Sequence, residues 1–396
     1  MTPRTEITEA VPQFDTFVGV DLHKTTVTLV AVDAGRRGVG RLKIDTKCIG
    51  KIARFLDELP GRTWMAVEAV GFVEWFIDRF RTHVGRIDIA DATALAHLRG
   101  KRRKTDWNDA SDVAERLARG ECPLGYIASD AVMTLRKLGR HWRRLSKTLS
   151  RAKHGMKSML NAANLRGPKF DGASAHKWLL AHGHRLKGVQ RAAFADLLDV
   201  VLLIERQKQR LRRRILFANR REEVADTVTA CKTVPGIDEV WACIIAAEVG
   251  PFERFPNADA LEFWAGLTPD TQESAGRVQS GHITKAGSPA LRWALGMAAM
   301  VLCRFDPAWH AKRERLRRRL GKPKANVAMA RRLLRMLYAM RRDGTCFHAG
   351  RGAPRAPQAR TRRRAGPGRW ASPRRQSAAA FFAPQPAAGA GRVAKA

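Results

Sequence analysis

The stretch FVGVDLHKTTVTLVAVD, residues 17–33, has the pattern of two β-strands joined by a short turn. Val and Thr dominate both halves, and these β-branched residues favour strands. The first predicted strand ends in a carboxylate, Asp21. An acidic residue at such a position usually caps the following turn, but carboxylates from several strand ends can also converge on one edge of a sheet. The residues that follow therefore decide both the fold and the role of Asp21.

After this stretch, the sequence alternates between strand and helix patterns. Three strands in succession, followed by alternating helices and strands, are typical of an α/β domain with a mixed sheet. We predict such a domain over residues 15–125. The expected strands are two within 17–33 and one each at 40–46, 63–70 and 86–92, and the expected helices are 49–59, 73–80 and those within 92–119.

Residues 128–225 have a different pattern, in which apolar residues recur at alternating spacings of three and four. This is the period of a coiled coil, and we predict a long helical coiled-coil hairpin with an ordinary helical bundle as the alternative. The glycine-containing segment between the two series is the expected turn of the hairpin. Lys208 is the one polar interruption in the two series, which are Leu135, Leu138, Trp142, Leu145, Leu149, Ala152, Met156 and Met159, and Phe194, Leu197, Val201, Ile204, Lys208, Leu211 and Ile215.

Two further regions complete the chain. Residues 228–342 are predicted to form an all-α unit punctuated by Pro and Gly. Residues 344–396 are dominated by Arg, Ala, Pro and Gly, a composition typical of a disordered basic tail.

The charge balance indicates a polyanionic partner. The 396 residues include 73 Lys and Arg against 37 Asp and Glu, a net charge of +36. Such an excess is most consistent with binding to nucleic acid. Part of it lies in the tail, which has no acidic residue after Asp343, but RQKQRLRRR at 206–214 lies in a region expected to fold.

Other sequence features point to a cytoplasmic protein. The six cysteines include no C-x-x-C pair, so a zinc site or redox pair is not expected. We find no signal peptide and no apolar run of membrane-spanning length, so we expect no membrane association.

Three more carboxylates occupy positions comparable to that of Asp21. Glu68 ends the segment MAVE, residues 65–68 of the predicted strand, and Asp106 and Asp109 lie in KTDWNDA, at the start of a predicted helix. Residues three apart share a helix face, so all four carboxylates could reach one point. This order of acids is that of ribonuclease-H-like nucleases.

Magnesium explains why such acids would gather. Mg²⁺ takes oxygen ligands and retains waters that phosphate oxygens can replace. Two ions about 4 Å apart can assist phosphodiester cleavage, and four carboxylates without a cation would repel one another. Which of Asp106 and Asp109 contacts metal directly is left open by the sequence. The preceding Lys101, Arg102, Arg103 and Lys104 are predicted to hold a phosphate backbone, with a solvated basic turn as the alternative.

The motifs GVDLHK, VEA and KTDWNDA resemble the DEDD motif of bacterial insertion-sequence transposases with a RuvC-like nuclease domain, a family that includes recombinases guided by a bridge RNA. The resemblance covers about residues 15–342. It implies a Mg²⁺-dependent DNA recombinase in which the four acids are catalytic and bind the metal. It also implies a bacterial protein associated with the nucleoid. Its implied partners are DNA at the element ends and target, a non-coding guide RNA, and further copies of the chain in a dimer or tetramer.

The segment GLTPDTQESAGRVQSGHITKAGSPALR, residues 266–292, reads as a Gly- and Ser-rich loop that runs into a helix, with Ser288 as N-cap and Pro289 in its first position. It resembles the C-terminal domain of the same family, and the resemblance places the nucleophilic serine at Ser274. Glu273 and Ala275 depart from the family pattern. Ser280 is the fallback nucleophile and Thr284 a remoter one, and Arg277, Lys285 and Arg292 are expected to contact nucleic acid.

CKTVPGIDEVWACIIAAEVGPFERF, residues 231–255, has the outline of a helix-hairpin-helix with a turn at Pro235 and Gly236. Asp238 stands where a second glycine is expected, so a purely structural turn is as compatible with the sequence as a phosphate contact.

The sequence thus predicts a transposase that cuts and rejoins DNA. The alternative is a RuvC-like junction-resolving nuclease that uses the four acids and water without a covalent intermediate. A third hypothesis is a non-catalytic nucleic-acid-binding protein.

Overall fold

A computed structural model describes residues 11–99, 105–219, 224–274 and 277–348. The described residues form two compact units. The first contains the chain up to Ile127 together with Glu253–Ala260, and the second contains Ala128–Phe252 and the residues from Leu261 onward. The predicted basic tail lies, from residue 349 onward, outside the described residues.

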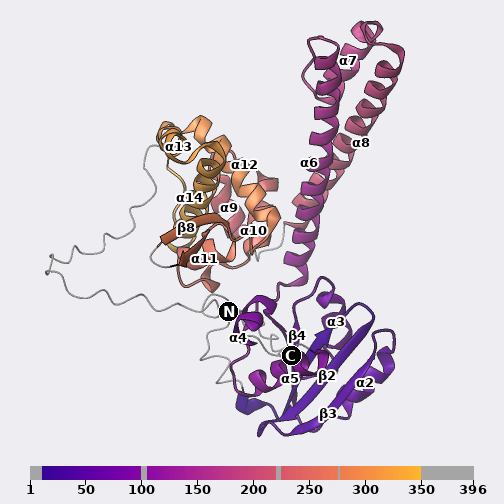
Figure 1. The fold of residues 1–396 in the computed structure, drawn as a ribbon, viewed down its shortest axis with the longest axis vertical. Coiled ribbons are helices and arrows are strands. Elements are labelled where there is room, and N and C mark those ends of the chain that lie inside the picture. Colours follow the sequence, from indigo (N-terminus) through magenta and orange to yellow (C-terminus); the bar gives the residue numbers. More distant parts are fainter. Residues whose placement is uncertain (1–10, 100–104, 220–223, 275–276, 349–396) are drawn as a thin grey trace, which may run out of the picture. The chain divides into compact units, whose positions relative to one another are not determined.

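A six-stranded mixed sheet forms the frame of the first unit (Figure 1). Its strand order is β3-β2-β1-β4-β5-β6. The central strand β1 pairs antiparallel with β2 and parallel with β4, which confirms the prediction of a mixed sheet. The strands are β1 (Thr16–Leu22), β2 (Thr26–Asp33), β3 (Gly38–Asp45), β4 (Thr63–Glu68), β5 (Arg86–Ala90) and the short β6 (Leu124–Gly125).

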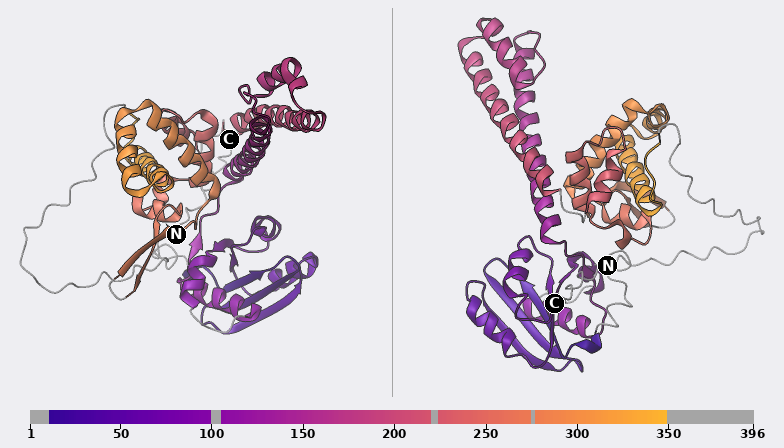
Figure 2. Two further views of the ribbon diagram at one scale, coloured as in Figure 1. Left: turned by 45° about the horizontal axis from the view of Figure 1, so that its top comes forward. Right: turned by 180° about the vertical axis from the view of Figure 1, so that it is seen from behind.

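Helices cover both faces of this sheet (Figures 1 and 2). On one face, α2 (Ile49–Asp57) and α3 (Val73–Phe80) pack over Val18, Val20 and Leu22 of β1. On the other face, α5 (Asp106–Ala118) packs beside Phe17 and Trp64. Because side chains alternate along a strand, Gly19 and Asp21 lie on the same face as Phe17, toward α5. The 3₁₀ turn η1 (Val11–Gln13) and α4 (Ala92–Arg99) complete this unit.

At Gly19 the backbone of a helix comes very close to the sheet. A Cβ atom built there would collide with the carbonyl oxygen of Ala110 and would lie 2.5 Å from the backbone nitrogen of Ala114. The missing side chain therefore lets the backbone of α5 rest directly on the backbone of β1. This contact sets the position of the first turn of α5 relative to the end of β1.

Two long helices, α6 (Asp130–Ala162) and α8 (Gly188–Ala218), begin the second unit and pack side by side as a hairpin (Figure 1). The sequence predicted only a turn between them, but the segment also contains α7 (Gly172–His182) and the short η2 (Gly183–Arg185). Asp171 caps α7, because its carboxylate accepts a hydrogen bond from the Ser174 N–H at 2.8 Å. Gly172 stands at the first helical position, where glycine does not stop a helix.

Two polar contacts cross the hairpin between α6 and α8. The Lys208 ammonium, predicted as the single interruption of the apolar pattern, lies 4.2 Å from the centre of the Trp142 ring, and burial lowers its pKa. Nearer α7, Glu205 accepts a hydrogen bond from Lys153 Nζ at 2.9 Å and one from the Gly172 N–H at 3.0 Å. These contacts fix how α6 and α8 are aligned along their axes.

The rest of the second unit is mainly helical (Figure 2). A buried carboxylate, Glu262, joins its parts by accepting hydrogen bonds from Arg331 and Arg335. Its elements are α9 (Ala225–Lys232), α10 (Glu239–Val249), β7 (Pro269–Ser274), β8 (Arg277–Ile283), α12 (Pro289–Phe305), α13 (Pro307–Leu320) and α14 (Lys322–Arg342). Two more elements, η4 (Phe252–Arg254) and α11 (Ala258–Trp264), include residues assigned to each of the two units.

The strands β7 and β8 differ from the loop that the sequence predicted. They pair antiparallel, with Gln272 opposite Gln279 and Ser274 opposite Arg277. Gly and Ser dominate the composition of this segment, but strand pairing uses backbone groups that every residue here except Pro269 carries.

Among the helices that the structure describes, none combines the length and apolar character needed to cross a membrane.

We expect Gly19→Ala to lower the free energy of unfolding of the first unit by about 3 kcal/mol or more, because the new methyl group would force α5 away from β1. Thermal or denaturant unfolding followed by circular dichroism measures this change. Gly38→Ala is the matched control in the same sheet, since a Cβ atom there meets nothing within 4 Å. Equal stability of the two variants would contradict the proposed backbone contact.

Candidate active site

Two of the predicted acids come from adjacent parallel strands. The register pairs Val20 of β1 with Val67 of β4, so the next residues along the two strands are Asp21 and Glu68. Val20 and Val67 both face the core beneath α2 and α3. Asp21 and Glu68 therefore both point to the opposite face, where α5 lies.

The other two acids come from the first turn of α5, which begins at Asp106. Thr105 is the N-cap, and its hydroxyl accepts a hydrogen bond from the Asn108 N–H at 3.2 Å. Asp109 is buried, whereas Asp106 is partly exposed. A helix N-terminus carries partial positive charge, so it favours both carboxylates.

The electrostatics of Asp21 show that the four acids share one site. Burial raises the pKa of the Asp21 carboxyl above its ordinary value. The negative charges of Glu68, Asp106 and Asp109 raise it further, while His23 acts in the opposite direction. All four carboxylates therefore lie near enough to influence one another, but of the four only Asp21 and Asp106 belong to the group, with His23, whose ligand atoms lie within 4.8 Å of one another.

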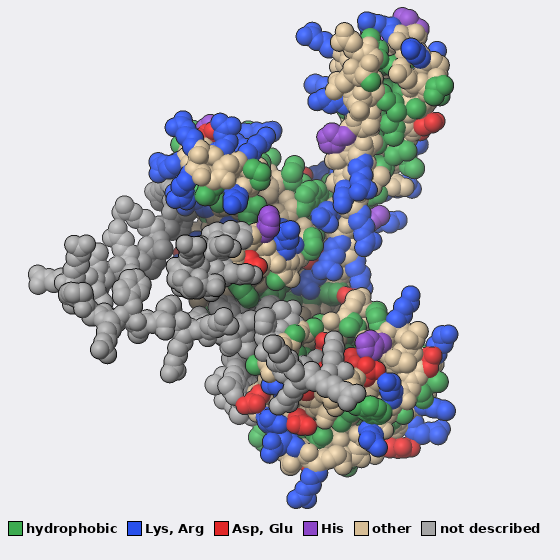
Figure 3. All heavy atoms as spheres, in the orientation of Figure 1, with side chains coloured by type: hydrophobic (Ala, Val, Ile, Leu, Met, Phe, Trp, Pro, Cys, Tyr) green, Lys and Arg blue, Asp and Glu red, His purple; other side chains and the backbone are tan. Residues whose placement is uncertain are grey.

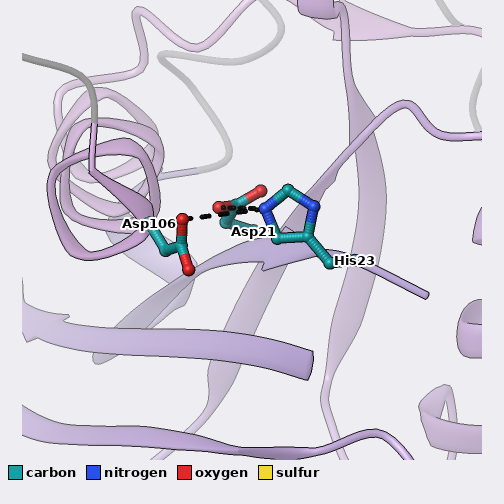
Figure 4. A group of neighbouring side chains, drawn as sticks. All are labelled: Asp21, His23 and Asp106. Atoms are coloured by element: carbon teal, nitrogen blue, oxygen red, sulfur yellow. Dashed lines mark ion pairs between the residues drawn. The ribbon is translucent and has the colours of Figure 1, made fainter. Parts of the chain in front are cut away.

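Two basic side chains also belong to this site (Figure 4 shows His23 with the two aspartates). His23, just beyond β1, places Nε2 3.2 Å from Asp21 Oδ2 and 3.7 Å from Asp106 Oδ1. Lys43 of β3 donates a 2.8 Å hydrogen bond to Asp106 Oδ2, which is the main cause of the lowered pKa of Asp106. Lys43 thus offsets part of the negative charge, and His23 adds to this effect whenever its imidazole is protonated.

The donor set fits a divalent cation. Asp21, His23 and Asp106 each offer one ligand atom, and these three atoms lie within 4.8 Å of one another. In an octahedral site with bonds of about 2.1 Å, neighbouring ligand atoms are about 3.0 Å apart and opposite ones about 4.2 Å. The separations of 3.2 and 3.7 Å from His23 Nε2 fall within this range. Carboxylates suit Mg²⁺, and an imidazole adds affinity for transition metals such as Mn²⁺.

Sequence reasoning missed His23 and Lys43. His23 lies inside the quoted motif GVDLHK, so its place directly after a strand end was a usable signal. Lys43 is distant in sequence from every acid of the site, and only the pairing of β3 with β2 brings it near α5. The predicted phosphate-binding residues 101–104 lie outside the described residues.

The predicted serine nucleophile lies in the second unit. Ser274 is the last residue of β7, opposite Arg277 of β8 and next to the end of the hairpin. Ser280 lies within β8, where it pairs with Thr271. Thr284 follows β8, and its N–H donates to the Thr268 carbonyl at 3.0 Å.

The base of this hairpin is held by backbone contacts and one arginine. The Arg292 guanidinium donates to the carbonyls of Ala265 and Gly287. Lys285 is exposed and has a positive φ of 55°, a strained conformation for a residue with a side chain, and its N–H donates to the Gly266 carbonyl at 3.2 Å. The predicted N-cap is confirmed, since Ser288 Oγ accepts hydrogen bonds from the N–H groups of Ala290 and Leu291.

The helix-hairpin-helix outline corresponds to α9 and α10. Gly236 has a φ of 93°, and a Cβ atom there would lie 2.6 Å from Val301 of α12. Asp238, which stands where a second glycine was expected, caps α10 by accepting a hydrogen bond from the Trp241 N–H at 2.9 Å. The turn packs against α12, which favours the structural interpretation over a phosphate contact.

Comparison with protein families gives a match within the second unit. Residues 228–314 match the model of the Transposase IS116/IS110/IS902 family. This range runs from α9 into α13 and includes the hairpin with Ser274.

Individual relatives extend the similarity. A protein of Streptomyces coelicolor, "Insertion element IS110 uncharacterized 43.6 kDa protein", is 32% identical over 119 residues, 30% of this chain and 29% of its own length. "Putative transposase y4pF/y4sB" of Sinorhizobium fredii is 23% identical over 85% of this chain and 86% of its own. "Putative transposase y4qE" of the same organism is 24% identical over 74% and 73%. The chain is therefore similar to insertion-sequence transposases, as the motifs suggested.

Substitutions of His23 and Lys43 test the donor set, because they should change the affinity for Mn²⁺ in opposite directions. We expect His23→Ala to weaken Mn²⁺ binding about tenfold, because a ligand is lost. We expect Lys43→Gln to strengthen it, because a cation no longer competes for Asp106. Electron paramagnetic resonance titration of free Mn²⁺ measures both, and Asp21→Asn serves as the variant without a working site. Stronger Mn²⁺ binding in His23→Ala would show that the imidazole only neutralises charge.

Proposed function

We propose that this chain is an IS110-like insertion-sequence transposase that cuts and rejoins DNA strands. The observation that carries the proposal is the group of four interacting carboxylates at one edge of the mixed sheet, in a chain similar over most of its length to transposases. The net charge of +36 supports a polyanionic substrate.

Asp21, Glu68, Asp106 and Asp109 are the proposed catalytic and metal-binding residues, with His23 as a further ligand and Mg²⁺ as the ion. Mg²⁺ bound there would supply positive charge for the attacking and leaving oxygens of a phosphodiester. The contribution of the chain is to hold the ligands in place. The ends of β1 and β4 fix Asp21 and Glu68, and the capped first turn of α5 fixes the two aspartates.

Ser274 is the proposed nucleophile. Its Oγ forms an ester bond to phosphorus, the bond from phosphorus to the sugar oxygen breaks, and the hydroxyl proton ends on the leaving oxygen. A hydroxyl from a second strand then attacks the phosphoserine, which joins the strands and restores the serine. Support comes from the position of Ser274 next to the end of the β7–β8 hairpin, inside the region that matches the transposase family. In this reaction the two units act together on DNA, within one chain or between protomers.

The proposed partners are DNA, a guide RNA and further copies of the chain. The long hairpin of α6 and α8 is the proposed oligomerisation element, in a dimer or tetramer. Residues 101–104, Arg277 and Lys285 are proposed to contact nucleic acid. Arg292 was also expected to contact nucleic acid, but its guanidinium donates to two carbonyls of its own chain, which favours a structural role.

We expect Asp109→Asn to reduce strand cleavage by at least about a hundredfold, because charge stabilisation at a metal-assisted site is worth several kcal/mol. Cleavage of a labelled duplex carrying the element ends measures the loss, and a gel-shift assay on the same duplex provides the binding control, which should change little. Full cleavage by this variant would refute the carboxylate site.

We expect a covalent protein–DNA adduct on denaturing gels and its disappearance in Ser274→Ala. Ser280→Ala is the matched control within the same hairpin and should retain the adduct. An adduct that persists in Ser274→Ala would place the nucleophile elsewhere. Cleavage without any adduct in the unmodified protein would favour the junction-resolving nuclease.

A further inference from the structure

We propose that an exposed basic patch at the junction of α13 and α14 binds the phosphate backbone of duplex DNA. The patch consists of Arg315, Arg318, Arg319, Lys322 and Lys324. None of these residues belongs to the contacts named above. The inference takes its partner, DNA, from the proposed function and adds a second binding surface.

The patch is exposed and carries unbalanced charge. All five side chains are exposed. Among the described residues, none of them forms an ion pair with an acidic side chain. The single acid of α13, Glu314, is already engaged by Arg313 at 3.3 Å and Arg317 at 2.8 Å. The positive charge of the patch is therefore available to a partner outside the second unit.

Helical spacing gathers the three arginines on one side of α13. Arg318 and Arg319 follow Arg315 at intervals of three and four, and residues at these intervals are neighbours on a helix surface. Lys322 and Lys324 continue the charge at the start of α14, after the turn at Gly321. Figure 3 shows Lys and Arg side chains gathered over this end of the unit.

A rigid base supports the patch. Trp309, on the opposite side of α13, is 3% exposed, and the Arg332 guanidinium lies over its ring. The Arg313 Nε donates a hydrogen bond to Asn326 Oδ1 of α14 at 3.2 Å. Asp306 caps α13 by accepting hydrogen bonds from the N–H groups of Ala308 and Trp309. These contacts fix the helix backbone that carries the arginines.

The helix dipole does not account for this charge. Basic residues in the last turn of a helix are favoured by about 0.3–1 kcal/mol each, which suits Arg318 and Arg319. It gives no reason for Lys322 and Lys324, which lie at the start of α14, where a positive charge is disfavoured. Guanidinium groups bind phosphate through two parallel hydrogen bonds. Binding to the phosphate backbone of DNA therefore explains the whole patch.

The test compares two triple variants with the same loss of charge. One is Arg315→Gln, Arg318→Gln and Arg319→Gln. The control is Lys51→Gln, Arg54→Gln and Arg79→Gln, which removes exposed charges from α2 and α3. Binding to a 30-base-pair duplex is measured by fluorescence anisotropy over a range of salt concentrations in EDTA, so the result does not depend on cleavage chemistry.

We expect the α13 variant to bind DNA about ten- to a hundredfold more weakly at moderate salt, and the slope of log K against log salt to fall by about 2 to 3, as for the loss of three phosphate contacts. The control variant should keep the slope of the unmodified protein. Equal slopes for the two variants, with both folded by circular dichroism, would overturn the proposal.

A parallel titration with an RNA hairpin of matched length separates the two nucleic acids. If the α13 variant lowers the slope of log K against log salt for RNA but not for DNA, the assignment to DNA is overturned. The proposed function has its own test: it is refuted if Asp109→Asn still cleaves DNA. That outcome would not affect the binding measurement, which is made in EDTA.

Discussion

The contact between the backbones of β1 and α5 at Gly19 is the constraint on which the candidate active site depends. Asp21 lies two residues beyond Gly19, and Asp109 precedes Ala110, whose carbonyl faces the glycine. A larger residue at position 19 would separate the strand from the helix, and with them the carboxylates that each carries. The site is thus fixed by main-chain packing, which is stiffer than side-chain packing because it has no rotamers to adjust.

The acidic site combines attraction and repulsion in one small volume. Burial and three neighbouring carboxylates disfavour the charged form of Asp21, whereas Lys43 and His23 favour the charges nearby. The basic groups contact the acids directly, Lys43 through Asp106 and His23 through Asp21 and Asp106. Because both are more than two-fifths exposed, they can also move aside at little cost.

Much of the fold, and the places of the four acids within it, could be predicted from the sequence, because strand ends and helix starts have local signatures. Asp21 and Glu68 follow apolar strands, and Asp109 follows a threonine cap. Lys43 could not be predicted, because it lies more than sixty residues before Asp106 in the sequence. Only the pairing of β3 with β2 brings the two residues together. The β7–β8 hairpin was missed for a different reason: its composition is that of a loop, and the backbone pairing that orders it leaves little trace in residue types.

The two polar contacts inside the hairpin of α6 and α8 restrict how such a chain can change length over evolution. Trp142 must stay level with Lys208, and Lys153 with Glu205. An insertion in one helix alone would shift every apolar residue beyond it out of the seam. Tolerated changes should therefore add or remove matched blocks of about seven residues from both helices, because seven residues make about two helical turns and restore the same face. The arm can be lengthened or shortened, but only in steps.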